Sequence, residues 1–202
     1  CIYSGAGSGK SFVIREFMKD QNEKQMPILA STGAAAVLLG GRTFHSFFGL
    51  GIMEGGAYAT FQRLLNDGAT LNRIKKVEGV IIDEISMIPG EAFRTAEMIA
   101  QVARESSLPW GGMRIIAVGD FGQLPPVTKH GQKRDWCFLT ETWRKTGFQT
   151  CRLHFNQRIQ DNGFLQVLDD VRHGRMTELV KEFLQEHTKF HDEDHPGTRL
   201  FP

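Results

Sequence analysis

Cysteine, net charge and long apolar runs are all in short supply in this sequence of 202 residues. Its three cysteines, Cys1, Cys137 and Cys151, form no Cys-x-x-Cys pair, so neither a disulfide framework nor a zinc knuckle is indicated. Lysine and arginine number 24 against 23 for aspartate and glutamate, which excludes a cationic arm that binds nucleic acid by charge alone. No run reaches the roughly 18 apolar residues of a membrane span. We therefore expect an intracellular protein without a membrane partner, whose function depends on local motifs.

Short apolar runs alternate with helical patterns along the chain, which is typical of parallel strands joined by crossover helices. The apolar runs lie at residues 2–3, 27–31, 80–83 and 114–119, and the helical patterns at 12–20, 34–39 and 91–105. The runs at 80–82 and 115–118 lack alternation of period two, as strands covered on both faces should. We predict an α/β fold, a three-layer sandwich with a mostly parallel central sheet.

The remaining segments are predicted more coarsely. Residues 49–56 are glycine-rich and predict a loop, followed by helices around 61–66 and 71–76. The apolar spacing from 161 to 186 is helical, and Gly174 predicts a break between two helices.

A glycine-rich loop follows the first apolar run and opens the first helix. It consists of Gly5, Ala6, Gly7, Ser8, Gly9, Lys10 and Ser11. Small residues allow backbone N–H groups to surround phosphate oxygens, the Lys10 ammonium reaches the β and γ phosphates, and the Ser11 hydroxyl can ligate Mg²⁺. The usual pattern has glycine where this sequence has Ser4. A plain glycine-rich turn is the alternative, but the strand, loop and helix setting favours ATP binding.

Two acidic residues end the next buried run, and a polar segment follows the one after it. Asp83 would hold Mg²⁺ and Glu84 would orient or deprotonate the attacking water. Both stand where open α/β sheets place their ligands. The Gln123 amide, before Pro125 and Pro126, could contact the γ phosphate and a water, although a proline-stabilised turn explains this segment equally well.

Taken together and in this order, these segments resemble the petite integration frequency (PIF) family of superfamily 1 DNA helicases. The segments that carry the resemblance are Ser31–Ala36, Gly41–Phe47, Asp83–Met87 and Gly119–Pro126, with Phe93, Arg104 and Pro109–Gly112 between the last two. The resemblance implies a RecA-like P-loop NTPase fold. Residues 1–202 would then be the first RecA-like ATPase and motor domain, with 198–202 starting the link to a second RecA-like domain.

The resemblance also implies an activity. An ATP-dependent DNA helicase motor couples ATP hydrolysis to movement along single-stranded DNA, 5′ to 3′, and to duplex unwinding. Its cofactors would be ATP and Mg²⁺, and its partners single-stranded and forked or structured DNA. Such a protein would work in DNA replication, repair, recombination and telomere maintenance. It would do so in the cytoplasm or nucleoid of a bacterium or phage, or in the nucleus or mitochondrion of a eukaryote.

The resemblance assigns roles to particular residues. The expected catalytic residues are Lys10, Asp83, Glu84, Gln123 and Arg158, with Ser11 and Asp83 on Mg²⁺. The match around Arg158 is imperfect, because Gln157 and Ile159 replace the usual Phe and Gln. The expected DNA contacts are Thr32, Gly33, Thr43, His45 and Ser46. Phe47 and Phe48 could stack on bases, but we expect at least one of them in the core.

Two other interpretations of the nucleotide site, and one possible metal site, compete with these assignments. A P-loop phosphotransferase would need an arginine-rich lid and has no use for the Gly119–Gln123 segment, and a nucleotide-gated scaffold would not need Glu84. His187, His191 and His195 recur every four residues, as metal ligands on one helical face can. Their surroundings are so polar that a solvated helix end or loop is the better interpretation.

Overall fold

The computed structural model describes residues 1–5, 7–128, 133–153 and 161–187. The chain divides into two compact units, residues 1–158 and residues 159–202. No helix in the described ranges is long and apolar enough to cross a membrane.

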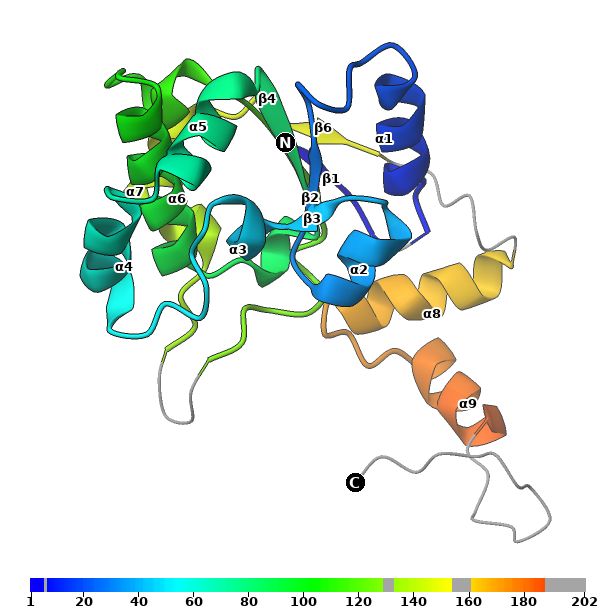
Figure 1. Ribbon diagram of the computed structural model, residues 1–202. Coiled ribbons are helices and arrows are strands. Elements are labelled where there is room, and N and C mark those ends of the chain that lie inside the picture. The colour runs from blue at the N-terminus through cyan, green and yellow to red at the C-terminus, as the bar shows by residue number, and fades with distance from the viewer. Residues whose placement is uncertain (6, 129–132, 154–160, 188–202) are drawn as a thin grey trace, which may run out of the picture. The chain divides into compact units, whose positions relative to one another are not determined.

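The first unit is built on a six-stranded sheet of described residues (Figure 1). Its strands are β1 (Ile2–Tyr3), β2 (Ile28–Ala30), β3 (Arg42–Thr43), β4 (Gly79–Asp83), β5 (Arg114–Gly119) and β6 (Cys151–Arg152). The order across the sheet is β3-β2-β4-β5-β1-β6, and every neighbouring pair is parallel. All carboxyl ends of the strands therefore lie at one edge of the sheet. The predicted parallel sheet is confirmed, with the two-residue strands β3 and β6 added at its sides.

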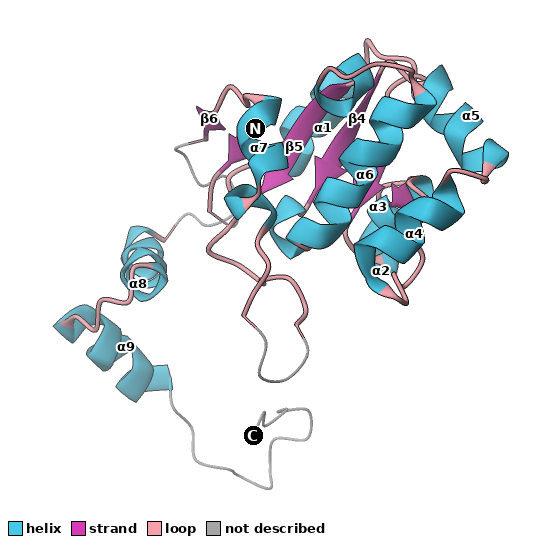
Figure 2. Cartoon of the chain, turned by 90° about the vertical axis from the view of Figure 1, so that its left-hand side faces the viewer, coloured by secondary structure: helices cyan, strands magenta, loops and turns pink. Residues whose placement is uncertain are grey.

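Helices cover both faces of this sheet (Figures 1 and 2). The helices of the first unit are α1 (Lys10–Met18), α2 (Gly33–Leu38), α3 (Phe44–Phe47), α4 (Gly56–Leu64), α5 (Gly68–Lys76), α6 (Gly90–Ala103) and α7 (Glu141–Thr146). Three short 3₁₀ turns, η1 (Ile85–Met87), η2 (Pro109–Gly112) and η3 (Cys137–Leu139), complete it within the described ranges. Helix α4 begins five residues before the predicted start at 61, because Gly55 caps it in a left-handed conformation, with φ 82°.

Consecutive residues of the central strands enter two separate cores. Val80 and Ile82 of β4 pack into the large core beneath α6, whereas Ile81 packs with Ile14 of α1 on the opposite face. Each of these four residues is at most 2% exposed. Burial on both faces explains why the strands read as unbroken apolar runs, and it confirms the three-layer arrangement.

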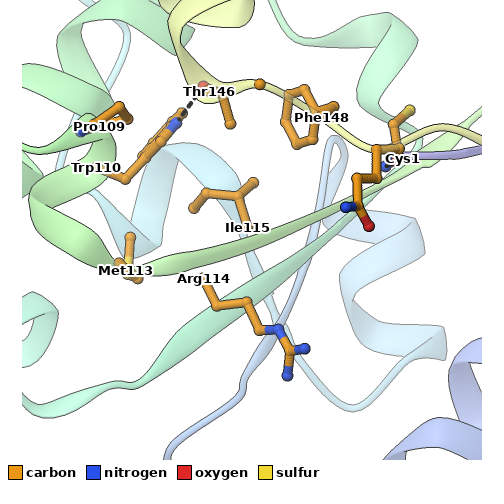
Figure 3. A pocket seen from close by; sticks show the side chains of 10 residues that line it. Cys1, Pro109, Trp110, Met113, Arg114, Ile115, Thr146 and Phe148 are labelled. Carbon is orange, nitrogen blue, oxygen red and sulfur yellow. Dashed lines mark hydrogen bonds between the residues drawn. The ribbon is translucent and has the colours of Figure 1, made fainter.

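The segment between α6 and β5 is held by specific polar contacts inside the large core. The indole Nε1 of Trp110 donates to Thr146 Oγ1 over 2.9 Å (Figure 3). Arg104 donates from Nε to the carbonyl of Gly111 and from Nη1 to that of Val77, each at 2.8 Å. These bonds join the segments just before β4 and β5, so the Pro109–Gly112 stretch is a structural support that lies away from the carboxyl ends of the strands.

The second unit contains α8 (Asn162–Arg172) and α9 (Glu178–His187), separated at Gly174 as predicted. The Asp161 side chain accepts a bond from the backbone N–H of Phe164 and caps α8. Val167 and Val180 are buried, and the rings of Phe164 and Phe183 stack with centroids 5.3 Å apart.

Candidate nucleotide and DNA site

Nearly all of the predicted site residues that are described lie at or just after the carboxyl ends of the strands. Thr43 ends β3, Thr32 follows β2, Asp83 ends β4, and Gln123 lies in the turn after β5. The glycine-rich loop follows β1, on the other side of β5. Because all strands are parallel, these segments share one edge of the sheet, the place where open α/β sheets bind their ligands. We call it the ligand edge.

The phosphate loop has the backbone geometry that its glycines suggest. Gly7 and Gly9 have φ values of 77° and 89°, in a region that residues with a Cβ rarely enter. Gly9 caps helix α1, which starts at Lys10. The Lys10 ammonium donates to the carbonyls of Ser4 and Gly5 over 3.1 and 3.0 Å. The lysine thus folds back over its own loop, and it would exchange these carbonyls for phosphate oxygens when a nucleotide binds.

The structure accounts for Ser4, the one departure from the usual loop pattern. Ser4 is 3% exposed, and its hydroxyl shares a hydrogen bond with the Ser8 hydroxyl. Ser8 also donates to the Gly5 carbonyl over 2.8 Å. A side chain at this position is therefore accommodated, with its polar atom satisfied within the loop.

Asp83 and Glu84, which we call the acidic pair, combine burial with backbone strain. Asp83 is 7% exposed, and burial raises its pKa, although the backbone N–H of Glu84 and the charge of Lys10 act in the opposite direction. Glu84 has φ 53° and ψ 45°, a left-handed conformation that costs a non-glycine residue about 1–2 kcal/mol. Asp83 Oδ1 accepts the N–H of Glu84 over 2.9 Å and supports this turn. The pKa of Glu84 is raised by burial first, and then by the charges of Asp83 and Asp120.

Gly119 makes room for the Glu84 turn at the end of the neighbouring strand. A Cβ added to Gly119 would lie 3.0 Å from both the backbone nitrogen and Cγ2 of Ile85. The turn that follows Asp83 therefore packs directly on the backbone of β5. Only glycine allows this approach without displacing Ile85 and, with it, the adjacent Glu84.

Asp120 is a site residue that the sequence reasoning did not single out. It is 1% exposed, accepts the N–H of Gly122 over 3.0 Å, and accepts the Gln123 amide N–H₂ over 3.1 Å. Gln123 is exposed, and its amide is held by Asp120 beside the acidic pair. The available signal was an aspartate directly after a buried strand, the same pattern that identified Asp83.

The residues predicted to contact DNA occupy two turns after neighbouring strands. Thr32 Oγ1 accepts the N–H of Ala35 and caps α2, and Thr43 Oγ1 accepts the N–H of Ser46 and caps α3. Within the described residues neither threonine hydroxyl donates a hydrogen bond, so each keeps its O–H for a ligand. Gly33 and Ser46 are exposed beside them.

His45 and the aromatic residues after it differ in their surroundings. Half-buried His45 has its pKa lowered by burial, so its ring is neutral near pH 7 and can offer an N–H without a charge. Phe47 and Phe48 are 2% and 0% exposed, within a cluster that includes Phe44. The expectation that at least one of them lies in the core is confirmed for both, which leaves neither ring exposed for stacking.

The donor set at the ligand edge fits Mg²⁺ bound together with a nucleotide. Ser11 has an exposed hydroxyl in the first turn of α1, and Asp83 has one carboxylate oxygen without a hydrogen bond among the described residues. Mg²⁺ takes one or two protein oxygens plus substrate phosphates in such sites. No group of three His, Cys, Asp or Glu side chains in the described part could hold a metal without such help.

Some predicted residues cannot be placed at this site. Ala6, Arg158, His191 and His195 lie outside the described residues. His187 is described, and its ring stacks on Phe183 with centroids 4.1 Å apart while Nδ1 lies 2.8 Å from the Phe183 carbonyl oxygen.

Comparison with known proteins gives the family. Residues 2–182 match the model of the PIF1-like helicases. The ATP-dependent DNA helicase Pif1 of Bdellovibrio bacteriovorus is 70% identical over 201 residues, which are 100% of this chain and 46% of that protein. The chain thus spans about half the length of this relative.

Solved structures confirm the fold. The Pif1 helicase of Candida albicans superposes with a TM-score of 0.83 at 30% identity, covering 96% of this chain and 45% of that one. The Bacteroides Pif1 in complex with ADP-AlF3 and single-stranded DNA gives 0.79 at 30% identity, covering 96% and 47%. The fold is RecA-like, as predicted, and the chain belongs to the PIF1-like helicase family.

Proposed function

We propose that this chain is the first RecA-like motor domain of an ATP-dependent DNA helicase, which couples ATP hydrolysis to 5′-to-3′ movement along single-stranded DNA and to unwinding of forked or structured duplexes. One observation carries the proposal. The phosphate loop, the acidic pair and the Gln123 segment share the ligand edge with Thr32 and Thr43, so nucleotide chemistry and strand contacts would lie on one sheet. Such a helicase would work inside the cell, in DNA replication, repair, recombination or telomere maintenance.

In the proposed hydrolysis step, Lys10 and the loop N–H groups bind the phosphates. Water attacks the γ phosphorus, its proton passes to the Glu84 carboxylate, and ADP leaves with the electron pair of the broken P–O bond. The raised pKa of Glu84 suits this base, because a base acts best when its pKa approaches the working pH. Mg²⁺ held by Ser11 and Asp83 would neutralise charge on the phosphates. The Gln123 amide, held by Asp120, would sense the γ phosphate.

In the proposed strand contact, phosphates receive hydrogen bonds from the hydroxyls of Thr32, Thr43 and Ser46 and from the N–H of His45. Gly33 lets the backbone approach closely. Such neutral donors position a strand without reading its sequence, which suits a motor that moves along any DNA. The Bacteroides relative was solved with single-stranded DNA and ADP-AlF3, which supports both ligands for this chain.

A second RecA-like domain would complete the nucleotide cleft and supply a further arginine, in addition to Arg158 of the present chain. Arginine contacts to the transferring phosphate are worth about 10³–10⁵ in turnover. We therefore expect the 202-residue chain alone to bind Mg-ATP weakly and to show little DNA-stimulated hydrolysis. Unwinding of a forked duplex by these residues alone would contradict the two-domain proposal.

Phosphate release from ATP in the presence and absence of single-stranded DNA tests the function. For the whole natural protein we expect release that DNA stimulates and that Glu84→Gln removes. A P-loop phosphotransferase would release phosphate only slowly and would transfer it to an acceptor instead. A nucleotide-gated scaffold would bind ATP and DNA without turnover, and that result would overturn the motor assignment.

The strand contact is tested by replacing Thr43, His45 and Ser46 together by alanine. Fluorescence anisotropy with labelled oligothymidylate should show weaker binding, while ATP affinity is retained. Ser107→Ala combined with Thr150→Ala is the control, because these exposed hydroxyls precede β5 and β6 and lie away from the carboxyl ends. Equal reduction of ATP and DNA affinity in the triple variant would indicate damage to the fold and would contradict a direct role in strand binding.

A further inference from the structure

A second concave site lies beside α3, at the margin of the sheet. It is a pocket of about 540 Å³ between the start of β2, strand β3 and helix α5. We call it the basic pocket, after the four cationic side chains that line it: Lys24, Arg42, Arg73 and Lys76. Glu23 is the carboxylate among its lining residues. The chain as a whole carries a net charge of only +1, so this pocket concentrates positive charge locally.

Three of the four cations have no acidic partner within the described residues. Lys24, Arg42 and Lys76 are exposed and take part in no ion pair there. Lys75, next to Lys76 on α5, behaves differently, because its ammonium lies 2.9 Å from a carboxylate oxygen of Glu105. The unpaired cations are thus a feature of the pocket and not of α5 as a whole.

The fourth cation, Arg73, is fixed by its neighbours. Its Nε and Nη2 donate to the Phe47 carbonyl over 2.9 and 2.7 Å, and Nη2 also reaches the Ser46 carbonyl at 3.3 Å. The guanidinium carbon lies 5.7 Å from the centroid of the Phe47 ring. Nη1 makes no hydrogen bond among the described residues. The guanidinium is therefore held in place with two N–H donors left for a ligand, which lowers the entropic cost of binding one.

Burial of the Arg73 guanidinium and its repulsion by Arg42 favour the binding of an anion in this pocket. The pKa of Arg73 is lowered, mainly by burial and then by the charge of Arg42, while Asp67 acts in the opposite direction. Within the described residues, no carboxylate is bonded to either guanidinium group. Two such groups that repel each other are stabilised when an anion binds between them.

The position of the pocket indicates which anion. Arg42 directly precedes Thr43 in β3, and Arg73 binds the carbonyl of Ser46, so one side of the pocket adjoins two predicted strand contacts. Pro27 and Val77, just before β2 and β4, line the other side, toward the amino ends of the strands. The phosphate loop follows β1, which three strands separate from β3. The ATP phosphates are therefore held elsewhere on the sheet. We propose that the basic pocket binds a phosphodiester group of single-stranded DNA, beyond the contacts at Thr43 and Ser46, and this inference rests on the proposed function.

The test removes two of the three exposed cations of the pocket and keeps Arg73, which supports α3. In the whole natural protein, Arg42→Ala with Lys76→Ala is compared with Lys19→Ala plus Lys75→Ala. The control pair changes the net charge by the same amount, and each of its lysines is engaged by a surface glutamate. Oligothymidylate binding is followed by anisotropy at several salt concentrations, and thermal melting verifies that both variants fold.

For the pocket variant we expect affinity to fall about tenfold at low salt. The slope of log K against log salt should shrink by about 0.7 for each phosphate that the variant no longer neutralises, because fewer counterions are released. The control should keep most of the slope of the natural protein, and ATP affinity should stay unchanged in both.

Several results would overturn the proposal. One is an equal loss of DNA affinity in the pocket and control variants, which would indicate that affinity depends on the overall positive charge and not on the pocket. Another is binding of inorganic phosphate that depends on Arg42 and Lys76 while DNA affinity is unchanged, which would assign the pocket to a free anion. Failure of the natural protein to bind oligothymidylate would refute the proposed function as well, whereas normal binding by the pocket variant would refute this inference alone.

Discussion

Two buried aspartates, one in each unit, have pKa values shifted in opposite directions. Asp83 at the ligand edge is 7% exposed and Asp170 in α8 is 4% exposed, so exposure does not separate them. Burial raises the pKa of Asp83. The pKa of Asp170 is lowered, first by its hydrogen bond with Arg175 and then by that with Thr177.

Burial is the leading cause of the pKa shift of Asp83, whereas polar neighbours outweigh it at Asp170. Asp170 accepts bonds from Arg175 at 2.9 Å, Thr177 at 2.9 Å and Gln166 at 3.2 Å. Among the described residues, Asp83 accepts a single bond, from the next residue, while the ammonium of Lys10 is bound to loop carbonyls. A carboxylate whose oxygens accept several hydrogen bonds from its own chain has a structural role. A carboxylate with few such hydrogen bonds, placed at a ligand edge, is suited to binding a cation or a substrate.

The largest expected effect comes from removing the cation that faces the acidic pair. Lys10→Ala should abolish tight Mg-ATP binding in a titration with a fluorescent nucleotide, because both the charge and the hydrogen bonds to the phosphates are lost. Lys19→Ala removes an exposed charge at the end of the same helix and should bind normally. Unchanged affinity in Lys10→Ala would rule out the phosphate-loop assignment.

A smaller but still large effect is expected from Glu84→Gln. The amide fills the same space but cannot accept the proton of the attacking water, so kcat should fall by about 10²–10⁴ while ATP affinity is kept. Glu16→Gln, at an exposed carboxylate of α1, is the control. If steady-state hydrolysis by Glu84→Gln remains near normal, the base lies elsewhere.

The close packing behind the acidic pair gives a third prediction. Gly119→Ala should lower the free energy of unfolding by about 1–3 kcal/mol and slow hydrolysis, since its Cβ would push on Ile85 and move Glu84. Gly68→Ala has no atom within 4 Å of the added Cβ and should be neutral or slightly stabilising. Thermal melting measures the stability and phosphate release measures the hydrolysis. Natural stability and hydrolysis in Gly119→Ala would show that the turn after Asp83 can shift without affecting Glu84.

The two aspartates can be compared directly by replacing each with asparagine. Asp83→Asn should raise the Tm of the nucleotide-free protein at pH 7, because it removes a poorly compensated buried charge while the amide oxygen still accepts the Glu84 N–H. Asp170→Asn should lower the stability of the second unit, because it weakens the bonds from Arg175 and Thr177. Calorimetry measures the Tm of both variants, and hydrogen exchange of α8 peptides measures the stability of the second unit. If both substitutions changed stability in the same direction, the distinction between the two aspartates would be contradicted.

The pH dependence of the same variants is the finest test. A raised folded pKa means that ionised Asp83 costs stability above that pKa, and this cost disappears as the pH falls toward the ordinary aspartate value of about 3.9. The advantage of Asp83→Asn should therefore shrink on acidification and be gone by about pH 3.9. Asp170 has a lowered folded pKa, so its contribution is lost only below about pH 3.9, where the disadvantage of Asp170→Asn should shrink. Melting curves of both variants across this pH range test these expectations. They would be contradicted if the effect of Asp83→Asn persisted below about pH 3.9 while that of Asp170→Asn disappeared above it.

The sequence by itself determined the elements whose physics is local. Unbroken apolar runs at 80–83 and 114–119 indicated buried parallel strands, and the glycines before Lys10 indicated a left-handed loop, because both patterns follow from short-range sterics and burial. Asp83 and Glu84 were recognisable because they end such a run. The turns around α3 were not, since β3 has only two residues and a four-residue helix shows too little periodicity.

Only the tertiary structure decided which polar groups are satisfied and which are left for a ligand. Phe47 and Phe48 have the composition of a stacking platform, but the packing of α3 places both in the core. Asp83 and Asp170 are the same residue with similarly low exposure, but burial dominates the pKa shift of Asp83 and hydrogen bonds from Arg175 and Thr177 dominate that of Asp170. The basic pocket brings residues 24, 42, 73 and 76 together across a sheet margin, which no spacing along the chain reveals. Electrostatics and packing act through space, and for these features the fold supplies the distances.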